Sequence, residues 1–303
     1  MSKLNIVTGA TGYTGKYVTH RLLAMGQRVK SLTNHPSREN PFGEKVVMQP
    51  FNFENPKALT ESLRGATTLY NTYWVRFSHG KVTFDLAVKN TKILIESAKR
   101  AGIKRIVHVS IANPDPNSDL PYYRGKGILE QAIMTSGLSY AIIRPTVIFG
   151  PEDILINNIA YLLRRSPIFA IVGSGEYKIQ PIFIEDMADL MVKASERADN
   201  FILDAVGPEI FTFNKLVELI KIKLNSRSNI FHISPTAMLP LSRLIGYLVK
   251  DVILTKEEID GLLANLLVSS QPPTGSTRFT EWLEKNITIL GDHYSSELSR
   301  HYQ

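Results

Sequence analysis

The feature that most constrains this fold is a glycine pattern close to the N-terminus. An apolar run over residues 4–7 is followed by Gly9, Gly12 and Gly15, and a helical stretch continues to about Gly26. Gly9 allows the tight turn out of the strand, Gly12 lets backbone approach a pyrophosphate, and Gly15 lets helix and strand pack closely. The helix N-terminus adds N–H groups and a partial positive charge for phosphates. The pattern therefore predicts a strand, a turn and a helix that begin a dinucleotide site.

The residues around this pattern favour a phosphate loop over an ordinary glycine-containing loop. Three spaced glycines alone would be weak evidence. Here Val18, Leu22 and Met25 fall on one face of the following helix, and a second apolar strand begins near Val29. We expect the turn to hold the cofactor through Gly9, Thr11, Gly12, Tyr13, Thr14 and Gly15.

The end of the second strand bears on which dinucleotide is bound. An NAD-specific site usually carries an acidic residue there for the ribose 2′-hydroxyl. This strand ends at residues 31–34 without one, and Asn34 is followed by His35 and Arg38. Such a loop could accept the additional phosphate of NADP, although Arg38 could instead be a solvated loop charge. The sequence favours NADP over NAD, with Asn34 and Arg38 as contacts.

Composition is that of an ordinary globular protein. The 303 residues are 44% hydrophobic and 21% charged, enough chain for one extended domain or two unequal ones. Because there is no cysteine, disulfides and thiolate chemistry are excluded and a reducing compartment is favoured. The N-terminus runs directly into the first predicted strand, so we expect no secretory signal and a cytoplasmic location.

The chain carries a formal charge of +7, which raises the question of anionic partners. Most of the excess is scattered and no RNA- or DNA-binding motif accompanies it, so a phosphorylated cofactor explains the charge better than nucleic acid does. The longest apolar region, residues 237–254, contains Pro240, Arg243, Lys250 and Asp251, which excludes a membrane span. Peripheral attachment to an anionic membrane through Arg243 and Lys250 stays an alternative.

Strands and helices alternate through the first part of the chain. Apolar runs at 45–49, 67–71 and 105–109 are predicted strands, and they are separated by a helix that Asn55-Pro56 opens and a long helix that Gly102 ends. Alternation at this spacing predicts a parallel sheet with right-handed crossovers. We therefore expect an α/β Rossmann fold with a doubly wound parallel sheet.

Polar and aromatic residues follow the third and fourth strands, at the edge where ligands bind in such sheets. Asn52 could hydrogen-bond the adenine, while Phe51 or Phe53 could pack on it or belong to the core. Tyr73 and Trp74 could wall the nicotinamide or the substrate, or simply pack the loop. The positions expected to contact the cofactor here are Asn52, Phe53, Asn71, Thr72 and Tyr73.

Tyr122 and Lys126 form a second constellation, spaced i, i+4 at the start of a helix. That spacing puts both on one helix face, so the ammonium can lie near the phenol. A nearby cation favours the phenolate and lowers a tyrosine pKa that is otherwise about 10, which suits proton transfer near neutral pH. Ser110, at the end of the fifth strand, could hydrogen-bond a substrate carbonyl or hydroxyl. After a glycine turn and a strand-ending serine, the otherwise common Y-x-x-x-K spacing indicates a catalytic site.

These motifs, with Asn90 in residues 88–92 and with Arg144-Pro145-Thr146, resemble the extended or atypical branch of the short-chain dehydrogenase/reductase superfamily. Residues 144–153 and 180–186 are more narrowly similar to NAD(P)-binding proteins related to the dinucleotide-binding accessory subunit of respiratory complex I. The NmrA-like regulators are close relatives of these proteins. The similarity covers the Rossmann part to about residue 206 and the remainder loosely.

The resemblance implies roles for individual residues. Tyr122 would be the general acid/base, and Lys126 its activator and a ligand of the nicotinamide ribose. Ser110 would orient the reacting carbonyl, and Asn90 would serve a proton relay or position its helix. The dipeptide Pro145-Thr146 would contact the nicotinamide carboxamide through its backbone.

Two departures from the family pattern bear on this implied activity. Gly125 stands beside Lys126 where the family often has serine or threonine, and the loop at 111–120 is rich in proline. The atypical branch also contains members that bind the dinucleotide and catalyse nothing. The retained Tyr122 and Lys126 favour catalysis.

Beyond Gly150 the strict alternation ends. We expect a helix at 154–163, a strand at 169–172 and a hairpin at Gly173-Ser174-Gly175, which lacks the flanks of a nucleophile elbow or a P-loop. A helix at 187–194 is expected with Glu185-Asp186 at its positive end, and a strand at 201–205 follows. Further helices are expected at 212–224, 238–249, 256–267 and 280–285, the third of them begun by a capping box of Thr255 and Glu258.

These elements predict two unequal domains. Residues 1–150, completed by about 180–206, would form the NAD(P)-binding Rossmann domain, and residues 151–179 with 207–303 a smaller, mainly helical substrate lobe. Nothing in the lobe names a substrate. The seven histidines are dispersed without a ligand pattern, so no metal site is expected, and His108 is interpreted as a satisfied interior histidine.

Three hypotheses of different class follow. The first is an NADP-dependent oxidoreductase or epimerase/isomerase, in which hydride moves to or from nicotinamide C4 while Tyr122 moves a proton on a small-molecule substrate. The second is a non-catalytic NADP-binding redox sensor or assembly protein. Replacing Tyr122 with Phe abolishes turnover only under the first. A third, a peripheral membrane protein acting on a lipid or quinone-like substrate, depends on residues 237–254 alone, and the oligomeric state is left open.

Overall fold

The computed structural model describes residues 2–302. The chain divides into two compact units. Unit 1 comprises the residues up to Pro145 together with Ile184–Ala205, and unit 2 comprises Thr146–Phe183 together with the residues from Val206 onward. Each unit has its own sheet strands and its own hydrophobic core.

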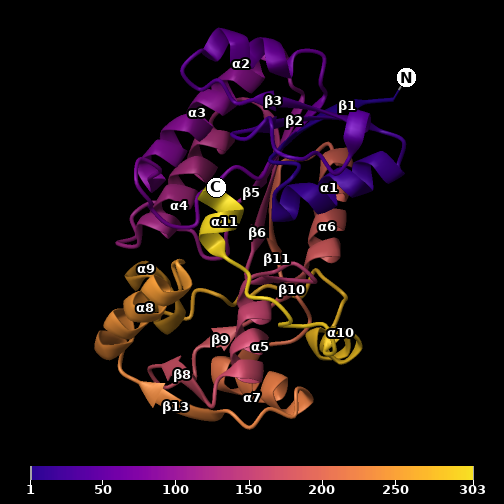
Figure 1. Cartoon of the computed structure of the whole chain (residues 1–303). Helices are drawn as coiled ribbons and strands as arrows, with labels where there is room; N and C mark the ends of the chain where they lie inside the picture. The colour runs from indigo at the N-terminus through magenta and orange to yellow at the C-terminus, as the bar shows by residue number, and fades with distance from the viewer. Residues whose placement is uncertain (1, 303) are drawn as a thin grey trace. The chain divides into compact units, whose positions relative to one another are not determined.

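Unit 1 is built on one seven-stranded sheet with the order β11-β6-β5-β4-β1-β2-β3 (Figure 1). Every neighbouring pair is parallel, as the sequence predicts, so the α/β Rossmann fold is confirmed. The strand order reverses between β1 and β4, and ligands of such sheets bind at the carboxyl ends of the strands beside that reversal. The strands are β1 (Leu4–Thr8), β2 (Arg28–Thr33), β3 (Val46–Pro50), β4 (Thr68–Asn71), β5 (Arg105–Val109), β6 (Ser139–Pro145) and β11 (Phe201–Ala205).

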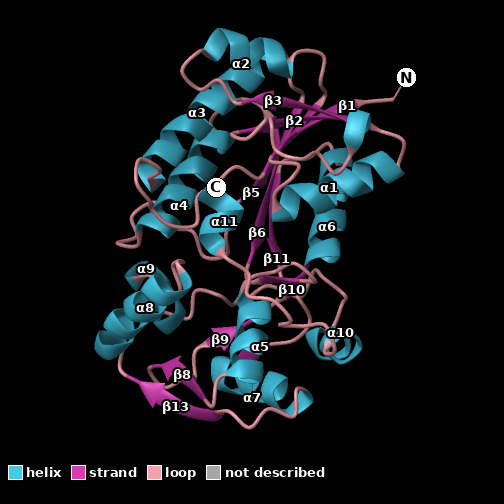
Figure 2. Cartoon of the chain, in the orientation of Figure 1, coloured by secondary structure: helices cyan, strands magenta, loops and turns pink. Residues whose placement is uncertain are grey.

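Helices cover both faces of this sheet (Figure 2). One face carries α2, α3 and α4, and the other carries α1 and α6. Asn55 accepts a hydrogen bond from Ala58 N at the start of α2, as its sequence signal predicts, and Gly102 ends α3. The bounds are α1 (Tyr13–Ala24), α2 (Pro56–Leu63), α3 (Phe84–Ala101), α4 (Pro121–Met134) and α6 (Ile184–Glu196), with a 3₁₀ turn η1 at Gly43–Lys45.

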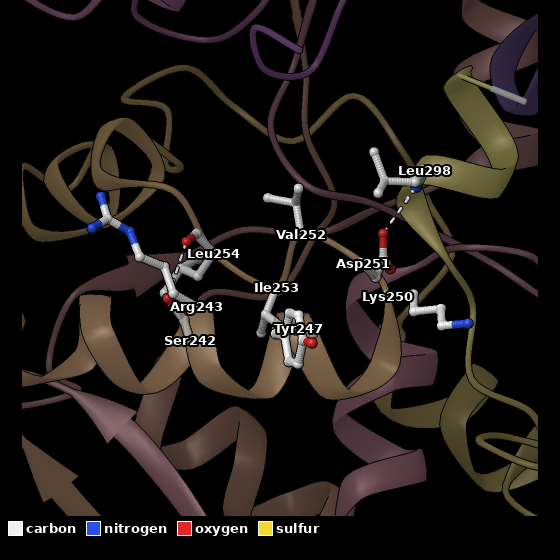
Figure 3. A pocket seen from close by; sticks show the side chains of 10 residues that line it. Ser242, Arg243, Tyr247, Lys250, Asp251, Val252, Ile253, Leu254 and Leu298 are labelled. Carbon is white, nitrogen blue, oxygen red and sulfur yellow. Dashed lines mark hydrogen bonds between the residues drawn. The ribbon is translucent and has the colours of Figure 1, made fainter. Parts of the chain in front are cut away.

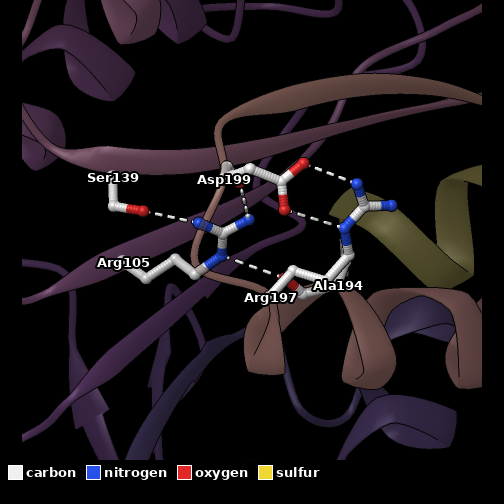
Figure 4. A network of polar contacts seen from close by, with 5 residues as sticks. All are labelled: Arg105, Ser139, Ala194, Arg197 and Asp199. Carbon is white, nitrogen blue, oxygen red and sulfur yellow. Dashed lines mark hydrogen bonds and ion pairs between the residues drawn. The ribbon is translucent and has the colours of Figure 1, made fainter.

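A buried arginine joins the amino ends of β5 and β6 to the end of α6. The Arg105 guanidinium, on β5, donates to Ala194 O at 2.9 Å, to Asp199 O at 2.9 Å and to the Ser139 hydroxyl (Figure 4). Arg197 forms an exposed two-point ion pair with Asp199 beside it. Since a buried guanidinium needs its donors satisfied, this network holds β5, β6 and the α6–β11 connection in register.

Unit 2 carries three short strand pairs and most of the C-terminal helices. Strands β7 (Ile148–Phe149) and β10 (Ile182–Phe183) pair in parallel, as do β8 (Ile168–Val172) and β13 (Asn229–Ile233), whereas β9 (Lys178–Ile179) and β12 (Phe211–Thr212) are antiparallel. Its helices are α5 (Leu155–Arg165), α7 (Phe213–Lys223), α8 (Pro235–Val249), α9 (Lys256–Leu263), α10 (Phe279–Asn286) and α11 (Glu297–Tyr302).

Aromatic side chains form the centre of the unit 2 core. The Phe149 ring meets Phe279 and Trp282 edge-on, with centroids 5.2 Å away in each case. Such edge-to-face pairs add to the stabilisation from burying the rings. None of the helices within residues 2–302 is both long enough and apolar enough to cross a bilayer.

The structure corrects one local prediction and adjusts others. The hairpin expected at residues 173–175 is wrong, because β8 pairs with β13 rather than with the strand that follows the turn. Gly173 N donates to Ile233 O at 2.8 Å, which extends that parallel pairing into the turn. The capping box at Thr255 is confirmed, although α9 ends at Leu263 instead of near Leu267.

Candidate active site at the carboxyl edge of the unit 1 sheet

The glycine turn between β1 and α1 adopts the geometry that its spacing predicts. Gly9 has a φ of +66° and its N–H donates to Leu32 O at 2.7 Å. A Cβ added to Gly15 would lie 2.1 Å from Gly9 O, so a side chain there would push the helix off the strand. Gly12 N donates back to Gly9 O at 2.8 Å, which closes the turn.

The N-terminus of α1 suits an anion. Gly12 is the N-cap residue and provides no side-chain cap, and the first turn contains no acidic residue. The partial positive charge of the helix end is therefore not neutralised by the helix itself. Thr11 leads into this end, and Tyr13 and Thr14 form its first turn.

The loop after β2 carries no carboxylate at the ribose position. Thr33, the last residue of β2, is buried and accepts a hydrogen bond from His35 N at 3.1 Å. Asn34 is exposed. Arg38 is half-buried, and its backbone N–H donates to His35 O at 3.1 Å. The turn thus brings an amide and a guanidinium into the stretch that follows the strand.

Three aromatic rings pack together beyond β3 and β4. Phe51 belongs to the core, stacks on Phe53 with centroids 4.7 Å apart, and contacts Tyr73 at 4.9 Å. Of the two readings open for Phe51, core packing is therefore the observed one. Asn52 lies between the two phenylalanines with a left-handed φ of +52°. Asn90 Nδ2 donates to the Tyr73 hydroxyl at 3.1 Å, so this amide holds the loop after β4.

A buried polar network links the ends of β1, β4 and β5. Asn71 Oδ1 accepts from the Thr8 hydroxyl at 3.3 Å and from Tyr73 N at 3.1 Å. Asn71 Nδ2 lies 3.0 Å from His108 Nδ1, and because the amide nitrogen is a donor, the ring proton belongs on Nε2. Burial, together with the nearby Lys126, holds the pKa of His108 well below its usual value. His108 is therefore neutral, and Thr72, whose N–H donates to the Thr8 hydroxyl at 2.7 Å, extends the network.

Lys126 is buried at the end of β5. Its side chain reaches back so that Nζ donates to Val109 O at 2.8 Å, and its charge faces the Trp74 ring at 4.6 Å. Burial lowers the pKa of Lys126 to about 7, against the opposing effect of Glu130. Glu130, four residues along α4, is held by Arg144 through Nε at 2.9 Å and a second contact from Nη2. The i, i+4 spacing of Lys126 and Glu130 is a sequence signal for the electrostatic effect of Glu130 on Lys126, and the sequence-based prediction did not include it.

Trp74 fills the space between the two expected catalytic residues. Its ring stacks on Phe84 and meets the Tyr122 ring edge-on at 5.7 Å. A Cβ at Gly125 would lie 2.7 Å from Trp74 Cη2, which explains why glycine replaces the serine or threonine of the family pattern. A Cβ at Gly127 would lie 2.4 Å from Pro116 N, so the proline-rich loop packs directly on α4.

Three buried polar atoms at this edge have no hydrogen-bond partner within residues 2–302. They are the Ser110 hydroxyl, Trp74 Nε1 and His108 Nε2. Leaving a buried donor or acceptor unpaired costs about 1–3 kcal/mol, so a polar ligand here would recover that loss. Ser110 follows Val109, the residue that receives Lys126, and Tyr122 precedes Lys126 by one helical turn. The structure thus brings Ser110 and Lys126 to one strand end, whereas Asn90 is engaged with Tyr73.

The last two expected cofactor contacts fall in different units. Pro145 ends β6, and its carbonyl accepts from Ala112 N at 2.8 Å. The Thr146 hydroxyl donates to Gln180 O within unit 2. Residues 2–302 contain no group of three or more His, Asp or Glu side chains placed to hold a metal ion.

Comparison with known proteins identifies an NAD(P)-binding domain. Residues 9–154 match the family model described as NAD(P)H-binding. A 40 kDa subunit of the mitochondrial NADH-ubiquinone oxidoreductase of Neurospora crassa is 24% identical over 84% of this chain and 69% of its own length. The photosystem II assembly factor Ycf39 of Cyanidium caldarium is 21% identical over 80% of this chain and 78% of its own length. A mitochondrial NADH dehydrogenase subunit of Arabidopsis thaliana is 24% identical over 71% of this chain and 56% of its own length. The chain therefore spans between 56% and 78% of the length of these three relatives.

Solved structures share the fold. The triphenylmethane reductase of Citrobacter sp. complexed with NADP(H) aligns with a TM-score of 0.73 at 17% identity, over 94% of this chain and 99% of that one. At this identity the likeness concerns the fold alone.

Proposed function

We propose that this chain, whose residues 9–154 match the NAD(P)H-binding family model, is an NADP-dependent oxidoreductase or epimerase in which Tyr122 moves the proton. One observation carries the proposal: Lys126 is buried at the end of β5, beside Ser110 and one turn after Tyr122. Burying an ammonium is unfavourable, so a fold that keeps one at a ligand-binding edge favours a functional role over a structural one.

NADP is the cofactor that the residues fit best. The uncapped N-terminus of α1 would take the pyrophosphate, and Arg38 with Asn34 would take the ribose phosphate that NAD lacks. When bound, the nicotinamide would supply or accept a hydride at C4. Thr72, Tyr73 and the backbone at Pro145-Thr146 would line its binding site, with Asn52 near the adenine.

The chain's own residues would manage the proton and the substrate oxygen. Tyr122 would donate or accept the proton, and a charged Lys126 would favour its phenolate. The unpartnered Ser110 hydroxyl would hydrogen-bond the reacting oxygen. Asn90 would act by holding Tyr73 in place, and Trp74 would exclude water from the reacting atoms. Because the pKa of Lys126 is about 7, the charge that would favour the phenolate, acting across the Trp74 ring between the two groups, is fully present only below that pH.

Parallel titration with NADPH and NADH tests the cofactor. Trp74 is the useful reporter because it belongs to the site, and a Trp282→Phe background removes the signal of the other tryptophan. We expect NADPH to bind at least about tenfold more tightly than NADH, a difference of ~1.4 kcal/mol. Binding of neither dinucleotide would remove the basis of both hypotheses.

The Tyr122→Phe variant tests catalysis. A screen of carbonyl and nucleotide-sugar substrates with NADPH should find turnover that this variant loses while cofactor affinity is nearly kept. Tyr123→Phe is the matched control, because Tyr123 is the adjacent, more buried tyrosine of the same helix. Turnover that is equal in the Tyr122→Phe variant and the unmodified chain would contradict the assigned role.

A second function is favoured by the relatives. One is a subunit of a respiratory enzyme and another is an assembly factor, which supports a non-catalytic NADP-binding sensor or assembly protein. This alternative expects Tyr122→Phe to change nothing, and Gly12→Val to abolish both dinucleotide binding and cellular function.

We propose a small-molecule substrate and no nucleic-acid partner for the first function. A cytoplasmic location is supported by the absence of cysteine, whereas the respiratory relatives are named as mitochondrial. Fractionation of cells that carry the full-length chain, followed by immunoblotting of the cytoplasmic and organelle fractions, decides between these locations.

A further inference from the structure

The second half of α8 exposes the side chains that a helix normally buries. Tyr247 is 83% exposed and Leu244 is 60% exposed. Ala237 and Pro240 are exposed as well, and the spacing of three or four places all four on one side of the helix. We refer to these residues, with Arg243, as the α8 face. On the opposite side Met238, Ser242 and Gly246 are buried.

The buried side is fixed by the segment that follows the helix. Asp251 N donates to Gly246 O at 2.9 Å, and the Ser242 hydroxyl lies 3.3 Å from Leu254 O. A Cβ on Gly246 would lie 2.5 Å from Asp251 O, so the segment lies directly on the helix backbone (Figure 3). The helix therefore cannot rotate to bury Leu244 and Tyr247 without breaking these contacts.

The charge of this region is one-sided. Residues 235–250 contain Arg243 and Lys250 and no acidic residue. The next residue, Asp251, is 6% exposed, and its carboxylate accepts from the Tyr294 hydroxyl at 2.7 Å and from Leu298 N at 2.9 Å. Figure 3 shows this carboxylate directed at Leu298. The negative charge is thus used inside unit 2, and the two cations remain at the surface.

A cavity opens beside the same residues. It measures about 480 Å³ and is lined by Arg243, Tyr247, Lys250 and the inward-bonded Asp251, together with the apolar side chains of 252–254. Cationic heads beside apolar walls and an exposed tyrosine are typical of surfaces that sit at a membrane interface. Since no helix within residues 2–302 could cross a bilayer, contact would be confined to the interface.

We propose that the α8 face docks on the surface of an anionic lipid bilayer. Leu244 and Tyr247 enter the headgroup boundary, while Arg243 and Lys250 contact the lipid phosphates. This surface belongs to unit 2 and does not depend on the dinucleotide. A bilayer is favoured over a protein partner because the apolar and cationic groups follow one another along α8 and its C-cap residue Lys250, with no acidic residue within 235–250.

Flotation of the full-length chain with vesicles tests the proposal. Phosphatidylcholine vesicles with and without phosphatidylglycerol are the probes, at low and at physiological salt. We expect flotation only with phosphatidylglycerol present, and weaker flotation at the higher salt, because the attraction of basic residues to anionic lipid is screened.

Two variants separate the apolar from the electrostatic part. Leu244→Glu with Tyr247→Glu should abolish flotation, and Arg243→Gln with Lys250→Gln should reduce partitioning by about tenfold or more. Ile222→Glu is the matched control, since Ile222 is 63% exposed on α7 and should leave flotation unchanged. Unaltered NADPH binding and thermal unfolding verify that each variant is folded.

Several outcomes would overturn the proposal. These are absence of flotation with anionic vesicles, equal flotation on neutral vesicles, and flotation that survives in the Leu244/Tyr247 variant. Equal loss in the Ile222→Glu control would also overturn it.

Discussion

The two units differ in what their buried polar groups are bonded to. At the carboxyl edge of unit 1, Ser110, Trp74 and His108 each keep a buried polar atom without a partner. In unit 2, Gln180 donates to Gly207 O at 2.9 Å and accepts from Ser269 N at 3.1 Å. Within residues 2–302, unit 2 also buries an unpartnered polar atom, the Tyr177 hydroxyl, but the polar groups around Gln180 hold its own loops. Unit 1 differs because three of its unpartnered atoms gather at one sheet edge, where a ligand could bond them.

The two glycine-rich turns show the same difference. In unit 1, the backbone of α1 at Gly15 packs against the turn at Gly9, and the N-terminus of α1 has no side-chain cap. In unit 2, the Asn214 side chain occupies the turn, because a Cβ on Gly175 would lie 2.0 Å from its Oδ1. Asn214 also donates to Ser174 O and to Glu176 Oε1, so no room is left for an anion. Glycine spacing alone does not distinguish these turns.

The strongest test of this difference is Gly15→Val. The new side chain would displace α1 from Gly9, and we expect NADPH affinity to fall at least about a hundredfold, ~2.7 kcal/mol, as measured by fluorescence titration. Gly175→Ala is the counterpart in unit 2. It should disturb the Asn214 contacts yet leave NADPH binding within about twofold, and an equal loss in both variants would contradict the contrast.

Each unit also contains a buried ionisable group whose pKa burial moves to about 7, and these two groups predict opposite pH trends. For Lys126 the folded pKa of about 7 lies below the unfolded 10.5, so the cost of burial is fully present below pH 7 and fades as pH rises to 10.5. For Asp153 the folded pKa of about 7 lies above the unfolded 3.8, so the cost is fully present above pH 7 and fades as pH falls to 3.8.

Lys126→Met should therefore stabilise the fold while removing function. At pH 6 we expect the free energy of unfolding to rise on the order of 2 kcal/mol, less than the pKa shift alone implies because the bond to Val109 O is lost. The gain should shrink toward pH 10, and turnover should be lost. Urea unfolding at both pH values measures this.

Lys92→Met is the control for that prediction, because Lys92 is an exposed lysine of α3. The change in the free energy of unfolding that Lys92→Met causes should be the same at pH 6 and at pH 10. A Lys126→Met variant that is less stable than the unmodified chain at pH 6 would show that the ammonium is held by favourable contacts.

Sequence reasoning was accurate where the signal is local. The pattern at 105–109 gives β5 at its observed bounds, and Asn55 and Thr255 cap the helices that their side chains predict. It failed where the partner is distant. The pairing of β8 with β13 joins segments about sixty residues apart, and an alternating pattern does not say which strand it will meet.

The candidate site shows the same limit. Spacing placed Tyr122 and Lys126 on one helix face, but it could not show that Trp74 packs between them. Gly125 departs from the family pattern because the indole ring of Trp74 leaves no space for a side chain there, and this contact is known only from the structure. A contact between side chains of different helices, strands or loops produces no periodic pattern in the sequence, so it cannot be predicted from spacing.

Asp153→Asn should give the opposite pH trend to Lys126→Met. Burial raises the pKa of Asp153, although N–H donors from Ile156 at 2.6 Å and Gly150 at 3.3 Å offset part of this effect. Relative to the unmodified chain, the variant should gain on the order of 2 kcal/mol on going from pH 5 to pH 8. Differential scanning fluorimetry across that range follows it, and NADPH binding should not change. A difference independent of pH would show that the carboxylate is charged throughout.

The smallest expected effect concerns the ribose phosphate. Arg38→Gln should weaken NADPH binding about tenfold, ~1.4 kcal/mol, because one charge-assisted contact to the phosphate is lost. NADH lacks that phosphate, so its affinity should change by less than about twofold. Arg28→Gln is the matched control, because Arg28 is an exposed arginine at the opposite, amino end of β2 and should affect neither cofactor. Equal weakening of both cofactors would place Arg38 against a part they share. No change with either would mean that Arg38 is a solvated loop charge, and NADP selectivity would then have to come from Asn34 or from the backbone of the same turn.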